Sequence, residues 1–382
     1  MRPRPVEFDL TEEQQQRIRR IRDAAVRMPR PEPGEAAGRD VWQAAGESGI
    51  TGLCLPEIHG GGGLGALDTA LGLEAFCAGG ADTGLAFAIA AHLLACGTVL
   101  AQHAGEAVRA ELLRGLASGR TIAANAMTED GAGSDVSRLA TTAVCDGDAY
   151  VLDGVKSFVS NGPLADILVT YAVTAPAAGF LGLSAFAVPT DLPGLRIGPP
   201  LAKAGLDGCA AARVEFSGCR VPGAYLMGAE GQGSAIFQAS MTWERACLPA
   251  IFLGTMEVQL RRCVTHAGQR RQFGRRIADF QAVSHRLAIM KQRLESSRLL
   301  LYRACWQVDK GSQDAGQAAA LAKVAVAESA VANGIDAAQV FGAKGYLTAE
   351  GIGGRLSDLV PLHIFSGTTD IQREIIVKGM GL

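Results

Sequence analysis

NAMTEDGAGSD, residues 125–135, is the stretch of the sequence that says most about the fold. It combines the hydroxyls of Thr128 and Ser134 with two glycines, Gly131 and Gly133. Glycine can take positive φ without steric cost, so these two let backbone N–H groups approach a ligand closely. Taken alone, such a segment is more often a surface turn closed by Ser and Asp side chains. The alternative is a site that holds a flat polar molecule.

The sequence on either side of this stretch divides into three blocks. Residues 121–226 have short apolar runs bounded by Gly, Pro and Asp, which predicts an antiparallel β-domain. Residues 1–120 carry helical signals, among them a helix start at Thr11 that two glutamates follow. Residues 227–382 contain two long segments, 286–308 and 315–341, with apolar residues at three- and four-residue spacing. We therefore expect an α+β chain with an α-helical N-terminal domain, a middle antiparallel β-domain and a C-terminal four-helix bundle.

The composition narrows the class of protein. A chain of 382 residues exceeds the size at which a single core stops growing, so several domains are expected. Its formal net charge of -2 gives no electrostatic reason to expect nucleic acid or an anionic membrane as a partner. The nine cysteines include no CxxC pair, so we expect no metal site and reduced, mostly buried thiols in the cytoplasm.

Two segments bear on export and membranes. The first residues, MRPRPVEFDLTEEQQQ, turn polar where a secretory signal needs its apolar region, so no export signal is evident. Residues 84–101 carry no formal charge, which approaches the length of a membrane span. This segment is rich in alanine and lacks aromatic or basic anchors at its ends, so a buried helix is the better prediction.

The opening stretch, taken together with AYVLDGVKSFVSNG at residues 149–162, resembles the flavin-binding β-domain of acyl-CoA dehydrogenases. In that family the first segment lies along the flavin and the second closes over its ring. A phenylalanine in a strand is more often plain core, but the neighbouring Lys156 and the SNG sequence after it favour the resemblance. The resemblance implies contacts to FAD from Met127, Thr128, Gly133, Ser134, Phe158 and Ser160.

Three later segments extend the resemblance over nearly the whole chain. RRQFG at 270–274 with the following Phe280 and Gln281 resembles the family's RxQFG motif, and QVFGAKGY at 339–346 resembles QxxGGxGY. IFSGTTDIQR at 364–373 resembles the closing IYEGTxEIQR motif. The first of these is also explained by a basic helix end, since arginines complement the helix dipole there. The resemblance implies FAD contacts, partly across a subunit boundary in a dimer or tetramer, from Arg270, Gln272, Phe273, Gln281, Gln339, Gly342, Thr368 and Asp370.

The catalytic base is where the sequence departs from most of the family. The glutamate that usually precedes GT in the closing motif is replaced by Ser366, whose unactivated hydroxyl cannot abstract an α-proton at neutral pH. In the isovaleryl-CoA dehydrogenase branch the base lies on an earlier helix, in a motif that ends Glu-Arg. MTWER at 241–245 stands at the corresponding place, so Glu244 is the predicted base. The alternative is a surface charge pair near the start of a helix.

The substrate is less sharply predicted. The resemblance places Ser134, Arg245, Ser366 and Gly367 around the substrate. Thr242 and GLDGCA at 205–210 depart from the family's usual contacts to CoA. The resemblance therefore favours an acyl or aminoacyl thioester on an acyl or peptidyl carrier protein, as in natural-product pathways, with short or branched acyl-CoA left open.

The activity that the resemblance implies is FAD-dependent α,β-dehydrogenation, with Glu244 as base, flavin N5 as hydride acceptor, and an electron-accepting flavoprotein or oxygen as the next partner. Two other classes stay open. One is a flavin oxidase or monooxygenase on the same scaffold that acts on a non-thioester substrate. The other is a non-catalytic flavoprotein, which Ser366 by itself suggests.

Overall fold

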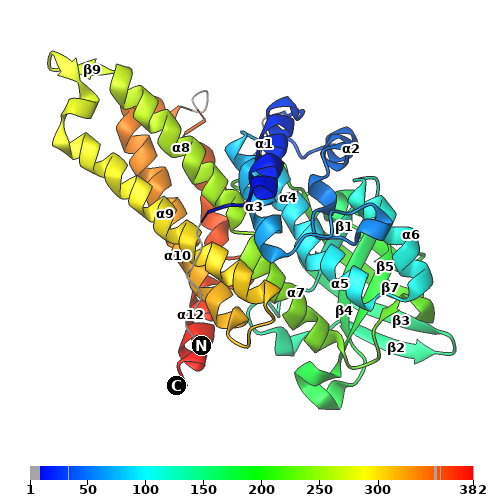
Figure 1. Ribbon diagram of the computed structural model, residues 1–382. Coiled ribbons are helices and arrows are strands. Elements are labelled where there is room, and N and C mark those ends of the chain that lie inside the picture. The colour runs from blue at the N-terminus through cyan, green and yellow to red at the C-terminus, as the bar shows by residue number, and fades with distance from the viewer. Residues whose placement is uncertain (1–8, 33, 348–350, 353, 382) are drawn as a thin grey trace.

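The computed structural model describes residues 9–32, 34–347, 351–352 and 354–381. The first eight residues, which include the two early arginines of the segment considered as an export signal, lie outside the described residues. The described chain forms a helical layer, a β-sheet and a long helical bundle, in that order along the sequence (Figure 1). This order agrees with the predicted fold class.

The N-terminal layer consists of helices around an apolar core. The first helix starts where the sequence predicts, because Thr11 and Gln14 cap each other, with Gln14 N–H donating to Thr11 Oγ1 at 3.2 Å and Thr11 N–H donating to Gln14 Oε1 at 3.0 Å. The helices are α1 (Glu12–Arg27), α2 (Arg39–Glu47), α3 (Ala66–Ala78), α4 (Thr83–Ala91), α5 (Thr98–His103) and α6 (Glu106–Ala117), with a π-helical turn (His92–Gly97) that joins α4 to α5.

The uncharged segment 84–101 is a buried helix, as predicted. It lies within Thr83–His103, which is long and apolar enough to cross a membrane, yet 89% of its most apolar window is buried inside the protein. A second helix, Ala315–Tyr346, meets the same criteria of length and composition, and 56% of its window is buried. Burial of this kind is what the core helix of a layered protein requires.

The middle domain is one sheet of eight strands, in which β6, β7, β3, β2, β4, β5 and β8 are neighbours in that order and β1 pairs with β4. Most pairs are antiparallel, as predicted, but β1 and β2 both run parallel to β4. The parallel pairs follow from the long connections between these strands, which the sequence pattern does not report. The strands are β1 (Ala123–Ala126), β2 (Thr142–Asp146), β3 (Ala149–Ser160), β4 (Ile167–Val173), β5 (Leu183–Pro189), β6 (Leu195–Ile197), β7 (Ala211–Pro222) and β8 (Leu226–Met227).

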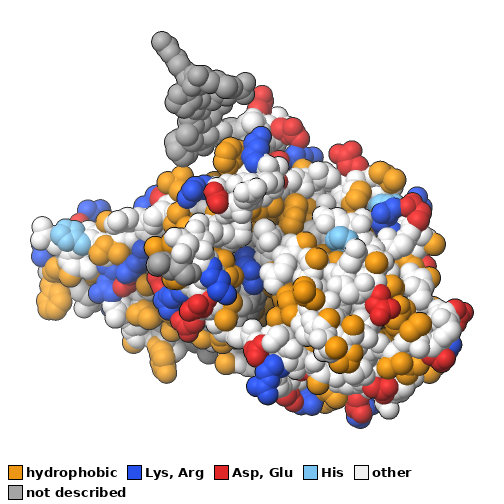
Figure 2. Space-filling model, turned by 90° about the horizontal axis from the view of Figure 1, so that it is seen from below, with side chains coloured by type: hydrophobic (Ala, Val, Ile, Leu, Met, Phe, Trp, Pro, Cys, Tyr) orange, Lys and Arg blue, Asp and Glu red, His pale blue; other side chains and the backbone are white. Residues whose placement is uncertain are grey.

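The C-terminal part is a bundle in which α8, α9 and α10 lie side by side and carry a small hairpin at their far end (Figure 1). The two predicted helical segments, 286–308 and 315–341, fall within α9 and α10. The elements are α7 (Gly233–Cys247), α8 (Ala250–Gln269), the hairpin strands β9 (Arg271–Gln272) and β10 (Arg275–Arg276), α9 (Gln281–Asp309), α10 (Ala315–Phe341), α11 (Gly354–Leu359) and α12 (Thr369–Gly379). Figure 2 shows acidic and basic side chains intermixed over the face viewed from below.

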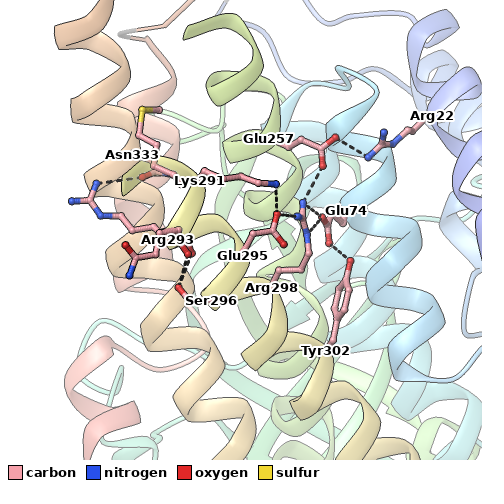
Figure 3. Close-up of polar contacts among 12 residues, drawn as sticks. Arg22, Glu74, Glu257, Lys291, Arg293, Glu295, Ser296, Arg298, Tyr302 and Asn333 are labelled. Carbon is pink, nitrogen blue, oxygen red and sulfur yellow. Dashed lines mark hydrogen bonds and ion pairs between the residues drawn. The ribbon is translucent and has the colours of Figure 1, made fainter. Parts of the chain in front are cut away.

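A charge network fastens the bundle to the N-terminal layer (Figure 3). Arg298 of α9 contacts Glu74 of α3 at 2.7 Å and Glu257 of α8 at 3.0 Å. Glu74 also accepts a hydrogen bond of 2.8 Å from the hydroxyl of Tyr302, and Arg22 of α1 reaches Glu257 at 2.9 Å. Because the carboxyl of Glu74 is almost fully buried, it depends on these partners in place of water.

His92 gives the fold a predicted pH dependence. The side chain is buried, its Nδ1 accepts a hydrogen bond of 3.0 Å from the N–H of Ala123, and burial lowers its pKa to about 4. Between pH 4 and about 6.5, His92 is protonated in the unfolded chain and neutral in the folded chain. The free energy of unfolding therefore falls as the pH falls through this window. We expect this group to remove about 2 kcal/mol between pH 7.5 and pH 5.

The measurement is urea unfolding at these two pH values for the wild type and for His92→Gln, whose amide oxygen can also accept from Ala123. The wild type should lose more stability than the variant by about that amount. Equal losses in both proteins would mean that His92 does not carry the effect.

Candidate active site

Glu244 lies in the last turn of α7, on the face that packs into the protein. Its side chain is buried, with only 7% of the residue exposed. The alternative of a surface pair near the start of a helix is therefore wrong on both position and exposure. A carboxylate is retained at so buried a site only where neighbouring groups stabilise it.

Ser366 is the residue that the fold brings to Glu244. Its hydroxyl donates a hydrogen bond to Oε1 of Glu244, although the two residues are 122 positions apart. Ser366 has a φ of 55° in the turn before α12, an uncommon conformation for a residue other than glycine. Its carbonyl accepts hydrogen bonds from Arg245 Nε at 3.0 Å and from Gln372 Nε2 at 3.1 Å. Three of the four residues predicted around the substrate, Arg245, Ser366 and Gly367, thus adjoin the predicted base.

The charge state of Glu244 is set by opposing influences. Burial raises its pKa, while the Ser366 hydrogen bond and the positive charges of Arg245 and Lys323 act to lower it. Its second oxygen, Oε2, is buried and has no hydrogen-bond partner among the described residues. A buried carboxylate with a raised pKa and one free oxygen has the properties of a general base.

Lys323 of α10 was not predicted, and it is part of this site. Its ammonium donates to the carbonyl oxygens of Gly367 at 2.8 Å and Leu362 at 3.1 Å, which fixes the turn that carries Ser366. Burial and the nearby Arg245 lower its pKa to about 8, against the influence of Glu244. The sequence signal was present, because Lys323 is the one charged residue in the alanine-rich run 315–327.

Apolar rings close one side of this site. Phe365 packs against Phe87 at 4.8 Å and against Phe252 at 6.1 Å between ring centroids. These rings give the site an apolar lining next to Ser366, and electrostatic interactions are stronger beside apolar groups than in solvent.

The stretch 125–135 leaves the sheet at the end of β1 and runs along the surface. Met127 is buried, Thr128 is half-buried, and Gly133 and Ser134 are exposed. Gly131 and Gly133 do not use the positive φ that glycine allows. A Cβ at either glycine would meet no atom within 4 Å, so they line open space beside the chain.

A buried ion pair, which sequence reasoning missed, supports this segment from behind. Lys156 donates to the carbonyl of Met127 at 3.1 Å and to Glu129 Oε1 at 2.8 Å. Glu129 also accepts hydrogen bonds from the N–H groups of Ala140 at 2.7 Å and Thr141 at 3.0 Å. The backbone that carries Thr128 is therefore held in one position, and its hydroxyl can face a ligand. Glu129 lies in the stretch 125–135 and Lys156 in the stretch 149–162, but no local sequence pattern indicates that the two form an ion pair.

Phe158 and Ser160 lie at the end of β3, next to a register shift between β3 and β7 at Lys156 and Val159. This irregularity turns Phe158 out of the sheet, with a φ of 57° and 65% of the residue exposed. The interpretation of Phe158 as plain core is thus wrong. A flat aromatic group with a hydrogen-bonding edge, such as a flavin, fits these features. They are the exposed ring of Phe158, the hydroxyl of the half-buried Ser160 and the open cradle at Gly131 and Gly133.

A second set of predicted residues converges at the far end of the bundle. The ends of α8 and α10 and the start of α9 line a cavity of about 460 Å³ that is open to solvent on one side. Its lining includes four residues predicted to contact FAD, Arg270, Gln272, Gln339 and Gly342, and also the cations Arg286 and Lys344. Several basic side chains and backbone groups around one cavity suit phosphate oxygens.

The remaining predicted residues lie outside that cavity. Phe273 is 93% exposed at the hairpin tip and contacts Phe280 edge-on at 6.1 Å, and Gln281 is the first residue of α9. Thr368 caps α12 by accepting from the N–H of Ile371 at 3.3 Å, and Asp370 pairs with Arg373 at 2.9 Å. Thr368 thus adjoins the Ser366 turn. The hairpin that begins with β9 lies at the far end of the bundle from α12 (Figure 1), and the cavity is lined by residues next to that hairpin.

The chain combines a buried carboxylate, an open cradle for a flat ring and a fold of helices, sheet and helices. Together these features are typical of flavin-dependent dehydrogenases. Three domains of one family match the sequence, the acyl-CoA dehydrogenase N-terminal domain at residues 11–120, the middle domain at 124–219 and the C-terminal domain at 231–381. The chain belongs to the acyl-CoA dehydrogenase family.

Three similar proteins place it more closely. L-prolyl-[peptidyl-carrier protein] dehydrogenase of Pseudomonas fluorescens is 51% identical over 89% of this chain and 90% of its own length. The structure of PigA with FAD and proline is 38% identical, with a TM-score of 0.95 over 99% of this chain and 100% of that one. The crystal structure of the prolyl acyl carrier protein oxidase AnaB is 35% identical, with a TM-score of 0.94 over 98% of this chain and 100% of that one.

Proposed function

We propose that this protein is an FAD-dependent dehydrogenase that oxidises an aminoacyl thioester, a prolyl group on a peptidyl carrier protein, between its α and β carbons. The observation that carries the chemistry is the free, buried Oε2 of Glu244 beside the Ser366 hydroxyl. The prolyl group and the carrier are supported by the names of the similar proteins.

The residues of this chain account for the proton half of the reaction. Glu244 Oε2 takes the α-proton, which the adjoining thioester carbonyl makes weakly acidic, and Glu244 becomes neutral. When bound, FAD supplies the acceptor for the hydride that leaves the β carbon. The thioester thereby loses one proton and one hydride and gains a carbon–carbon double bond. Phe87, Phe252 and Phe365 supply an apolar lining on the Ser366 side of the site.

The assembly belongs to the same proposal. The cavity with Arg270 and Gln339 lies at the hairpin end of α8, whereas α7, which carries Glu244, precedes the opposite end of α8. We therefore assign the cavity to the ADP half of the FAD of a neighbouring subunit in a homodimer or homotetramer. Arginine is suited to such pyrophosphate contacts because of its fixed fork of donors. The protein acts in the cytoplasm, and its electrons pass to oxygen or to an electron-accepting flavoprotein. The name of AnaB, an oxidase, supports oxygen.

The experiment is anaerobic bleaching of the bound flavin with a panel of thioesters. A prolyl group on a peptidyl carrier protein should bleach the flavin within one turnover, while prolyl-CoA and isovaleryl-CoA should react at least about a hundredfold more slowly, because they lack the carrier's contacts. Preferential bleaching by isovaleryl-CoA would place the chain with branched acyl-CoA dehydrogenases instead. No bleaching by any thioester would favour the non-catalytic flavoprotein.

A further inference from the structure

We propose that Ser366 is a positioning residue, which holds Oε1 of Glu244 so that Oε2 is the oxygen that accepts the substrate's proton. This inference rests on the proposed role of Glu244 as the base. Most members of the family have the catalytic glutamate at position 366, and the proposal gives the serine found there a role of its own.

The geometry gives the two carboxylate oxygens different surroundings. Oε1 accepts the hydrogen bond from the Ser366 hydroxyl, whereas Oε2 is buried and has no partner among the described residues. A carboxyl group with two equivalent free oxygens can rotate about its last bond. With Oε1 engaged, that rotation is stopped and one oxygen stays in place. Holding a reacting atom in this way is worth a large rate factor.

The turn that carries Ser366 is itself held in place. The carbonyl of Ser366 accepts hydrogen bonds from the side chains of Arg245 and Gln372. The carbonyl of Gly367 accepts hydrogen bonds from Gln372 at 2.9 Å and from Lys323 at 2.8 Å. These donors come from α7, α10 and α12, so three elements secure one turn. They maintain the positive φ of Ser366, which aims its hydroxyl at Glu244.

Other charged and titratable groups near Glu244 also influence its pKa, and the effect of Ser366 has to be separated from theirs. Arg245 and Lys323 are the nearby cations. Cys96 of the π-helical turn and Tyr171 of β4 lie within electrostatic range, and burial raises the pKa of each, so both stay neutral at working pH. The hydrogen bond from Ser366 favours the ionised carboxylate, so its removal moves the titration of Glu244 upward in pH.

The test uses a matched pair of variants of the FAD-loaded protein, Ser366→Ala and Ser366→Gly. Both lack the hydroxyl, but only glycine accepts the φ of 55° without strain, so an effect common to both belongs to the hydroxyl. The acid limb of the pH profile for single-turnover flavin reduction should move upward by about one pH unit in both. The plateau rate should fall about tenfold or more, with a smaller change in substrate affinity. Ser296→Ala, which removes an exposed hydroxyl bonded within its own helix, should match the wild type.

A second readout does not depend on turnover. Infrared difference spectroscopy of the resting protein follows the protonated carboxyl of Glu244, assigned by its loss in Glu244→Gln. Its titration should shift upward in both Ser366 variants. If Glu244→Gln still reduces the flavin at a normal rate, the proposed base is wrong. If Glu244→Gln is inactive while both Ser366 variants keep the wild-type titration and plateau rate, the base stands and the positioning role is overturned.

Discussion

Replacement of Glu244 by glutamine is expected to slow flavin reduction by the substrate by at least about a hundredfold, and up to about ten-thousandfold. The amide keeps the shape of the side chain and can still accept from Ser366, but it has no oxygen basic enough to take an α-proton. The bound FAD should stay in place, because no predicted FAD contact is altered. Stopped-flow absorbance in a single anaerobic turnover measures the rate, and the flavin spectrum of the purified variant checks loading.

A companion variant separates the position of the base from its identity. Glu244→Gln combined with Ser366→Glu places a carboxylate where most of the family carries one. Recovery of part of the rate would mean that the substrate is still within reach of position 366. Near-normal reduction in Glu244→Gln alone would remove Glu244 from the mechanism.

The largest effect on stability is expected from Arg298→Met, which should lower the free energy of unfolding by about 3–5 kcal/mol. The change leaves Glu74 buried against Tyr302 without its cation, and it also removes the contact to Glu257 (Figure 3). Burial already raises the pKa of Glu74, and the positive charge of Arg298 acts against that rise. Without Arg298, Glu74 must either hold an unpaired charge or take up a proton. Urea unfolding at pH 7.5 measures the loss.

The matched control is Arg373→Met, which removes pairs with Glu328 and Asp370. The side chains of Arg373, Glu328 and Asp370 are 55%, 54% and 86% exposed. Solvent screens both pairs, so their loss should change stability by no more than about 0.5–1 kcal/mol. Similar losses in the two variants would contradict the claim that the buried network fastens the bundle to the N-terminal layer.

Local signals in the sequence predicted the parts of the fold that depend on neighbours in the chain. Thr11 and the two glutamates after it predicted the start of α1, and short apolar runs with their breakers in 121–226 indicated the sheet. The parallel alignment of β1 with β4 was not predicted, because strand direction depends on where a long connection returns. The two glycines of the opening stretch leave open space beside the chain, which agrees with the expected close approach of a ligand.

The site was predictable in its residue types and not in its contacts. The sequence indicated that Ser366 replaces the usual catalytic glutamate and that Glu244 is the alternative base. Their hydrogen bond was not predicted, because it joins segments 122 positions apart. The buried lysines were harder to predict, because lysine is normally exposed and becomes stable inside only when tertiary partners meet it. Lys156 meets Glu129 and Lys323 meets two carbonyl groups, and neither arrangement has a local pattern.

The most direct measurement of the proposed activity is the mass of the thioester after one anaerobic turnover. The FAD-loaded protein is mixed with a prolyl group on a peptidyl carrier protein, and the aminoacyl group is weighed by mass spectrometry. With the wild type we expect a group lighter by two hydrogens, and with Glu244→Gln an unchanged group. An unchanged mass with the fully loaded wild type would mean that the protein does not dehydrogenate this thioester. With oxygen admitted, a group heavier by one oxygen atom and without the loss of two hydrogens would favour a monooxygenase instead.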